Sequence, residues 1–129
     1  EHGWLSGVAW DGEHLWTASQ QHGKLFKVDR ESGDVLETIP VPVASGGLAF
    51  YDGSLWLGIA HPMSFDSRYE QFNWEGDEQH FAILRLDPAT GAEQARYDIA
   101  FLPMGLAWIG DDLWLSHVAE YKLHRVRLT

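Results

Sequence analysis

The chain has 129 residues, of which 45% are hydrophobic and 13% aromatic, and it contains 7 tryptophans. This composition excludes a disordered chain and suits one domain with its own core. The formal net charge of −10 disfavours nucleic acid and anionic membrane surfaces as partners, and it favours a cationic ligand or a divalent metal. The absence of cysteine excludes disulfides and thiolate chemistry.

No apolar run reaches the roughly 20 residues that a membrane-spanning helix needs. No signal peptide is visible either. We therefore expect a soluble protein, whose compartment the sequence does not predict.

The first unit of an internal repeat runs from about residue 6 to residue 40. Residues 7–16 predict a short strand, a tight Asp-Gly turn and a second strand that opens with Leu-Trp. A third strand is expected at 25–29 and a fourth at 35–40. Between them, the pattern Asp-x-x-Ser-Gly at 29–33 predicts a type I turn that ends on a glycine.

The second unit, at about 46–99, repeats these features with one interruption. Its first two strands are predicted at 47–56, its third at 83–87 and its fourth at 93–99. In the first unit Leu25 follows Trp16 by nine residues, but here Ile83 follows Trp56 by 27. The second unit therefore carries an insertion, placed at 61–79.

The third unit, at about 104–129, repeats the Gly-Leu-Ala-Trp and Leu-Trp pattern at 105–114 and a third strand at 123–127. No sequence for a fourth strand follows. Four antiparallel strands recurring about every 40 residues are typical of a propeller blade. A sandwich of independent meanders would not explain why the same residues recur at the same offsets. The sequence thus predicts a single all-β domain, 1–129, forming a partial β-propeller of three four-stranded blades, the last without its outer strand.

Three blades are too few for a closed ring, since propellers typically have about 4–8. An open arc would leave apolar blade faces in water at both ends. We expect a homodimer that completes six blades. The alternative is that the chain is a piece of a longer propeller.

The pattern Gly-Leu-Ala-Trp-x-Gly-x-x-Leu-Trp, followed by Leu-x-x-Val-Asp-x-x-[Ser/Thr]-Gly, resembles the blades of streptogramin-lyase-like and glutaminyl-cyclotransferase-like propellers. It is also similar to NHL and SMP-30-like repeats. The resemblance covers residues 7–127 apart from the insertion, and it implies the fold. Those families include a lyase, a cyclotransferase, lactonases and binding scaffolds, so the resemblance implies no single activity. No catalytic motif of these families can be placed in this chain.

The insertion is the most distinctive local feature, because an extra loop at one place in a repeat array usually lies on the functional face. Imidazole and carboxylate groups at His61, Asp66 and His80 are candidate ligands for a divalent metal. The alternative is a solvated acidic loop, since the spacing matches no metal signature. Tyr69 and Trp74 either stack on a ligand or pack the loop onto the body or a second subunit.

Further candidates lie in loops that a propeller would bring to one mouth: His22, His61, His117 and Glu120. A His–carboxylate pair there suits a general base, and the alternative is a set of surface histidines. Two functions follow. The first is a binding or scaffold module that presents a small-molecule or protein site on its loop face. The second is a metal-assisted lyase or hydrolase of the propeller type.

Overall fold

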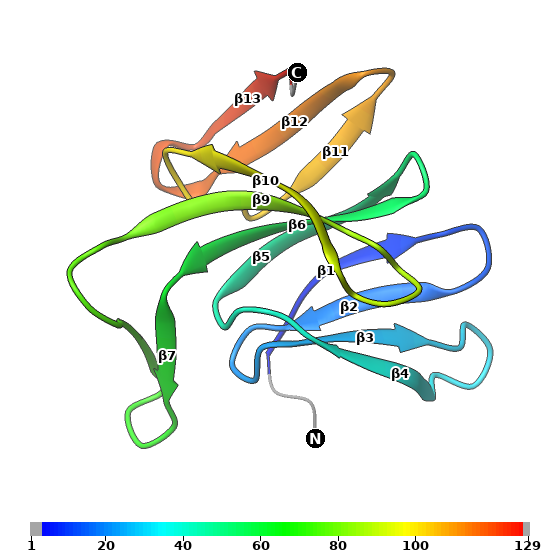
Figure 1. The fold of residues 1–129 in the computed structure, drawn as a ribbon, viewed down its shortest axis with the longest axis horizontal. Helices are drawn as coiled ribbons and strands as arrows, with labels where there is room; N and C mark the ends of the chain where they lie inside the picture. The colour runs from blue at the N-terminus through cyan, green and yellow to red at the C-terminus, as the bar shows by residue number, and fades with distance from the viewer. Residues whose placement is uncertain (1–3, 128–129) are drawn as a thin grey trace.

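The computed structural model describes residues 4–127, except for the side chain of residue 118. Within this range the chain forms thirteen strands and one short 3-10 turn, and it has no α-helix. The strands make four antiparallel sheets, three large and one small (Figure 1). No helix among these residues is long and apolar enough to cross a membrane. The predicted all-β class is therefore confirmed.

The first sheet contains four strands in sequence order, each antiparallel to the next: β1 (Leu5–Trp10), β2 (Leu15–Ser19), β3 (Lys24–Val28) and β4 (Val35–Pro40). Short connections between consecutive strands dictate this meander. The strands lie within a residue or two of the predicted positions.

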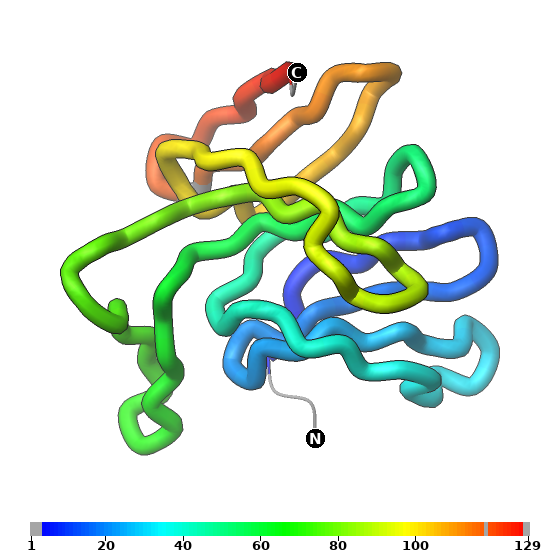
Figure 2. Tube along the Cα trace, viewed as in Figure 1, coloured from blue at the N-terminus to red at the C-terminus, as the bar shows by residue number. Residues whose placement is uncertain are grey.

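The second sheet also has four strands, but its sequence is interrupted. Its order is β10–β9–β6–β5. The bounds are β5 (Ser45–Tyr51), β6 (Ser54–His61), β9 (His80–Leu86) and β10 (Glu93–Ile99). The inserted residues form a separate hairpin of β7 (Met63–Asp66) and β8 (Gln71–Trp74), which extends from the ends of the two central strands, β6 and β9 (Figure 2).

The third sheet has three strands among the described residues: β11 (Leu106–Ile109), β12 (Asp112–His117) and β13 (Lys122–Val126). A 3-10 turn, Val118–Glu120, joins the last two. The innermost strand of the second sheet, β5, contacts both β1 and β11, so the three large sheets share a line of neighbouring inner edges.

The turns predicted from Asp-x-x-[Ser/Thr]-Gly form as expected. The backbone N–H groups of Glu31 and Ser32 donate to Asp29 Oδ1 at 2.8 and 3.1 Å. These two bonds lower the pKa of Asp29. Gly33 has a φ of 77°, and its N–H donates to the carbonyl of Asp29 at 2.9 Å. Only glycine adopts such a conformation without strain.

The three large sheets pack by one repeated rule. Trp16 and Ala18 of the first sheet belong to the same buried cluster as Leu55, Leu57 and Ile59 of the second sheet. In each strand, the residue that follows one of these points to the opposite face of its sheet. Accordingly, the cluster between the second and third sheets contains Trp56, Ile83, Leu113 and Leu115. Each large sheet thus has a tryptophan face and a leucine face, and the tryptophan face packs on the leucine face of the next sheet.

Trp56 is the centre of the second cluster. Its indole N–H donates to the carbonyl of Tyr51 at 3.0 Å, and its ring is only 4% exposed. The Trp108 ring meets it edge-on at 4.9 Å, and the Arg85 guanidinium lies over it at 5.3 Å. The indole therefore joins two sheets.

We expect Trp56→Ala to destabilise the fold by roughly 3–5 kcal/mol, because it empties a large buried volume between two sheets. Urea unfolding followed by circular dichroism measures the change. Trp10→Ala is the matched control, because Trp10 is 44% exposed. A loss below about 1 kcal/mol for Trp56→Ala would contradict the packing described above.

Candidate functional site

Five connections gather along one edge of the molecule, at the left in Figure 1. We call this edge the loop face; it comprises 20–23, 41–44, 61–80, 100–105 and 117–121. Backbone hydrogen bonds link some of these connections to each other or to the neighbouring strands β5 and β6. The N–H of Ala44 donates to Gln20, that of Ala60 donates to Ala44, and that of Gly47 donates to Pro103, at 3.0, 3.2 and 2.9 Å. The backbone itself therefore fixes three of the five connections, 20–23, 41–44 and 100–105.

The hairpin of the insertion is fixed to the body by aromatic contacts. Phe65 and Phe72 contact each other edge-on, and both contact the ring of Trp4, at 5.4 and 6.2 Å. Trp74 meets Phe81 of β9 edge-on at 5.6 Å. Tyr69, near the tip, is 70% exposed and lies beside the Arg68 guanidinium. Three of the four aromatics in the hairpin thus pack against other rings.

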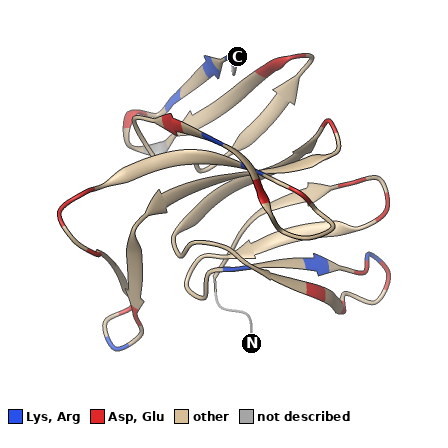
Figure 3. Ribbon diagram, in the orientation of Figure 1, with Lys and Arg blue, Asp and Glu red and all other residues tan. Residues whose placement is uncertain are grey.

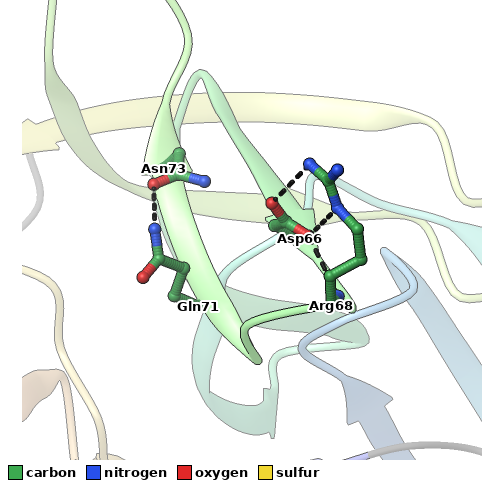
Figure 4. Close-up of polar contacts among 4 residues, drawn as sticks. All are labelled: Asp66, Arg68, Gln71 and Asn73. Carbon is green, nitrogen blue, oxygen red and sulfur yellow. Dashed lines mark hydrogen bonds and ion pairs between the residues drawn. The ribbon is translucent and has the colours of Figure 1, made fainter.

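The polar residues of the hairpin pair with one another (Figure 4). Arg68 donates to both carboxylate oxygens of Asp66, each at 3.2 Å. This hydrogen bond, with that from the Arg68 backbone, lowers the pKa of Asp66. Gln71 Nε2 donates to Asn73 Oδ1 at 3.0 Å. The Asp66 carboxylate is therefore already occupied by a cation of its own hairpin.

Two hollows lie side by side on the loop face, since both are lined by Phe81 and Leu102. One has a volume of about 260 Å³, and its other lining residues are Gln20, Ala44, Ser45, Ala60, Met63, Phe72 and Trp74. The second has a volume of about 430 Å³, and its other lining residues are Ala100, Phe101, Met104, His117 and Ala119. Together we call them the loop-face groove. Its walls are mainly aromatic and aliphatic, with a few polar groups, as is usual for small-molecule sites.

His117 is held rigidly at one end of this groove. Its ring stacks on Phe101 with centroids 4.1 Å apart and an interplanar angle of 5°. Its Nδ1 lies 3.1 Å from Glu120 Oε1. Glu120 reaches this position because it ends the 3-10 turn after β12. A carboxylate on one ring nitrogen orients the imidazole, which is how a general base is positioned.

Ser45, which lines the smaller hollow, has an unpaired side-chain oxygen. Ser45 is fully buried, and its Oγ has no hydrogen-bond partner among the described protein atoms. Buried hydroxyls normally have such a partner. Gln20 lines the same hollow. The lining of the smaller hollow therefore includes the polar residues Gln20 and Ser45, and that of the larger hollow includes His117.

The predicted ligand-binding residues fall into two groups. The first group lies at the groove: His117 and Glu120 are hydrogen-bonded to each other, and Trp74 lines the smaller hollow. The other three, His22, His61 and Tyr69, are exposed, and none of them lines either hollow.

The metal ligands predicted in the insertion, His61, Asp66 and His80, are not gathered into one group. Among the described residues, a three-ligand group within 4.8 Å forms only at His117, Glu120 and His124. His61 and His80 face each other across the β6–β9 ladder, whereas the hairpin holds Asp66 against its own arginine. Metal binding by His61, Asp66 and His80 therefore stays a prediction, and sequence spacing did not reveal the arginine pairing of Asp66.

His124 was not among the predicted site residues. It lies in β13 directly opposite Leu115, two residues before His117 in β12. Side chains two apart in a strand share a face, so His117 and His124 lie diagonally on one face. The turn length between β12 and β13 sets this register, and the sequence pattern alone did not reveal it.

No family model matches the chain, and no curated protein matches it. Among solved structures, it is similar to Myxococcus xanthus glutaminyl cyclase, with a TM-score of 0.61 at 16% identity over 88% of this chain. The chain covers only 43% of that structure. It is also similar to the computationally designed Ika4 protein, with a TM-score of 0.51 at 10% identity over 100% of this chain and 94% of the other.

At these identities the comparisons establish the fold alone. The chain has a propeller-like, all-β fold, and it spans less than half the length of the glutaminyl cyclase. The resemblance inferred from the repeated Gly-Leu-Ala-Trp and Leu-Trp segments is thus confirmed at the level of the fold.

We expect replacement of 62–79 by an Asn-Gly turn to leave the three large sheets folded. The reason is that the insertion leaves and re-enters at His61 and His80, which are already ladder partners and suit a two-residue hairpin turn. Near-identical circular dichroism of the remaining strands is the expected result. The smaller hollow should be lost, because Met63, Phe72 and Trp74 line it. Outright unfolding would show that the hairpin is required for folding.

Proposed function

We propose that this protein is a binding or scaffold module of the propeller type, and that its loop-face groove is a small-molecule site. The observation that carries this proposal is the pair of adjoining hollows of about 260 and 430 Å³. Their combined size suits a drug-sized ligand. Such a ligand would lie against Trp74, Phe81 and Phe101, with polar contacts at its ends.

The charge of the protein favours a cationic ligand. Acidic residues are concentrated in the turns and loops, and basic residues are fewer (Figure 3). Aromatic faces attract organic cations, and the Glu120 carboxylate lies at the His117 end of the groove. A planar or quaternary cation with an apolar body is therefore the ligand class we propose.

The test uses tryptamine and benzyltrimethylammonium as probes in ligand-observed NMR. We expect saturation transfer to both probes, with at least tenfold weaker binding for Trp74→Ala combined with Phe101→Ala. Tyr69→Ala is the matched control, because this aromatic of the hairpin lies outside the groove, and its binding should not change. If the control weakened binding as much as the double variant, the groove would not be the site.

We propose further that two copies join head to tail into a six-blade ring. Among residues 4–127, two faces of the large sheets are uncovered, and each is apolar. The leucine face of the first sheet has a hollow of about 210 Å³ lined by Leu5, Val8, Leu15 and Val28, among others. The tryptophan face of the third sheet has one of about 500 Å³ whose lining includes Ala107, Ile109, Trp114 and Leu123.

These two faces are the same kinds of surface that already pack together twice within the chain. Trp16 pairs with Ala9, Trp56 with Ala49 and Trp114 with Ala107 in the strand ladders. The third tryptophan face would therefore meet the first leucine face as the others meet theirs. Val8, Ile109 and Leu123 are 68%, 66% and 71% exposed, and exposed apolar patches of this kind mark interaction surfaces. A second copy of the chain is the occupant we propose.

Light scattering should give twice the chain mass for the unaltered protein, and Val8→Glu or Leu123→Glu should each give a monomer. Tyr69→Glu serves as the control and should remain dimeric. Mixing the Val8→Glu and Leu123→Glu variants should restore a dimer, because one intact face from each can form one junction. A concentration-independent monomer of the unaltered chain, or no recovery on mixing, would overturn the head-to-tail ring.

One observation favours a second function, a metal-assisted lyase or hydrolase. His117 is oriented by Glu120 and lines the larger hollow, which is the arrangement of a general base beside its substrate. Turnover of an ester, lactone or β-elimination substrate, lost in His117→Ala, would favour this function. A protein that binds the cationic probes without any turnover would favour the binding module.

A further inference from the structure

We propose that His117, Glu120 and His124 form a binding site for one divalent metal ion, with Zn²⁺ as the preferred ion. This inference goes beyond the proposed function, because it does not require a ligand in the groove. One ligand atom from each of the three side chains lies within 4.8 Å of the others. Two imidazoles and one carboxylate are a common donor set for zinc.

The two separations that involve Glu120 lie near the value expected for a shared ion. Zn–N and Zn–O bonds of about 2.0–2.1 Å at tetrahedral angles place neighbouring ligand atoms about 3.3–3.4 Å apart. Glu120 Oε1 lies 3.1 Å from His117 Nδ1 and 3.8 Å from His124 Nε2. These distances lie on either side of the tetrahedral value. Sub-ångström movement of the Glu120 side chain, which is 51% exposed, brings both to it.

Without an ion, one of the three groups is left without a hydrogen bond. His124 Nε2 is buried and has no hydrogen-bond partner among the described protein atoms. Its 3.8 Å separation from Glu120 is too long for a hydrogen bond. A buried imidazole nitrogen without a partner costs free energy. A metal bond at this nitrogen would remove that cost.

The protein holds the two rings in place before any metal binds. Phe101 stacks on His117, and its ring also lies 4.9 Å from that of His124. The two imidazole centroids are 5.9 Å apart. The antiparallel ladder of β12 and β13 fixes both backbones, since His117 pairs with Lys122 and His124 with Leu115. Ligands held by packing and by a ladder favour metal affinity.

Three protein ligands leave the fourth tetrahedral position for water or for a ligand. This number is typical of open zinc sites rather than of closed, structural ones. His117 also lines the hollow of about 430 Å³. The metal would therefore lie beside the groove.

The test is titration of the chelator-treated 129-residue chain with Zn²⁺ by isothermal calorimetry, and with Co²⁺ by visible absorption. We expect one Zn²⁺ per chain, and a Co²⁺ spectrum of the tetrahedral, thiolate-free type. His124→Ala and Glu120→Gln should each weaken the affinity at least tenfold. Circular dichroism and the thermal midpoint without metal check that each variant is folded.

The matched controls are His22→Ala and His61→Ala, which remove exposed histidines that are not part of the group. Both should bind Zn²⁺ as the unaltered protein does. Absence of stoichiometric binding by the unaltered chain would overturn the proposal. Equal weakening by either control and by His124→Ala would do so as well, since it would indicate nonspecific binding by surface imidazoles. If His124→Ala fails to fold, the Zn²⁺ affinity of Glu120→Gln tests the proposal instead. This variant should fold, because an amide has the same shape as a carboxylate and the exposed Glu120 side chain is not required for packing.

Discussion

Close contact between the backbones of the innermost strands is the constraint on which the rest of this fold depends. A Cβ atom added to Gly7 would lie 2.8 Å from the backbone nitrogen of Leu48, and one added to Gly47 would lie 2.9 Å from the Cα of Gly105. Real Cβ atoms do not approach other atoms so closely. The repeated glycine therefore allows one sheet to lie against the next at its inner edge, and the sheets diverge from that line.

That shared inner line explains the alternation of tryptophan and leucine faces. Once the inner edges are close, the gap between neighbouring sheets widens outward and needs large side chains to fill it. Trp16 and Trp56 fill the two gaps within the chain, and each packs against a leucine-rich face. The same geometry leaves one face of each kind uncovered. The assembly proposed above and the packing inside the chain therefore have a single physical origin.

Much of the architecture was predictable from sequence because it rests on short-range signals that recur. The Leu-Trp strands and the Asp-x-x-[Ser/Thr]-Gly turns each report local conformation, and β1–β4 follow them to within a residue or two. The site was less predictable, because it depends on contacts between distant segments. His117 and Glu120 were found from their loop position, whereas His124 required the β12–β13 register. The Asp66–Arg68 pair and the stacking of Phe101 on His117 depend on side-chain geometry that no spacing rule encodes.

The place where the hairpin joins the second sheet has a consequence for the evolution of this protein. The ladder between β6 and β9 runs without a break to the residues at the root of the hairpin. We therefore expect changes of length or sequence in that segment to leave the three large sheets in place while they reshape one wall of the smaller hollow. Under the function proposed above, such changes would alter ligand recognition at a single point of the sequence.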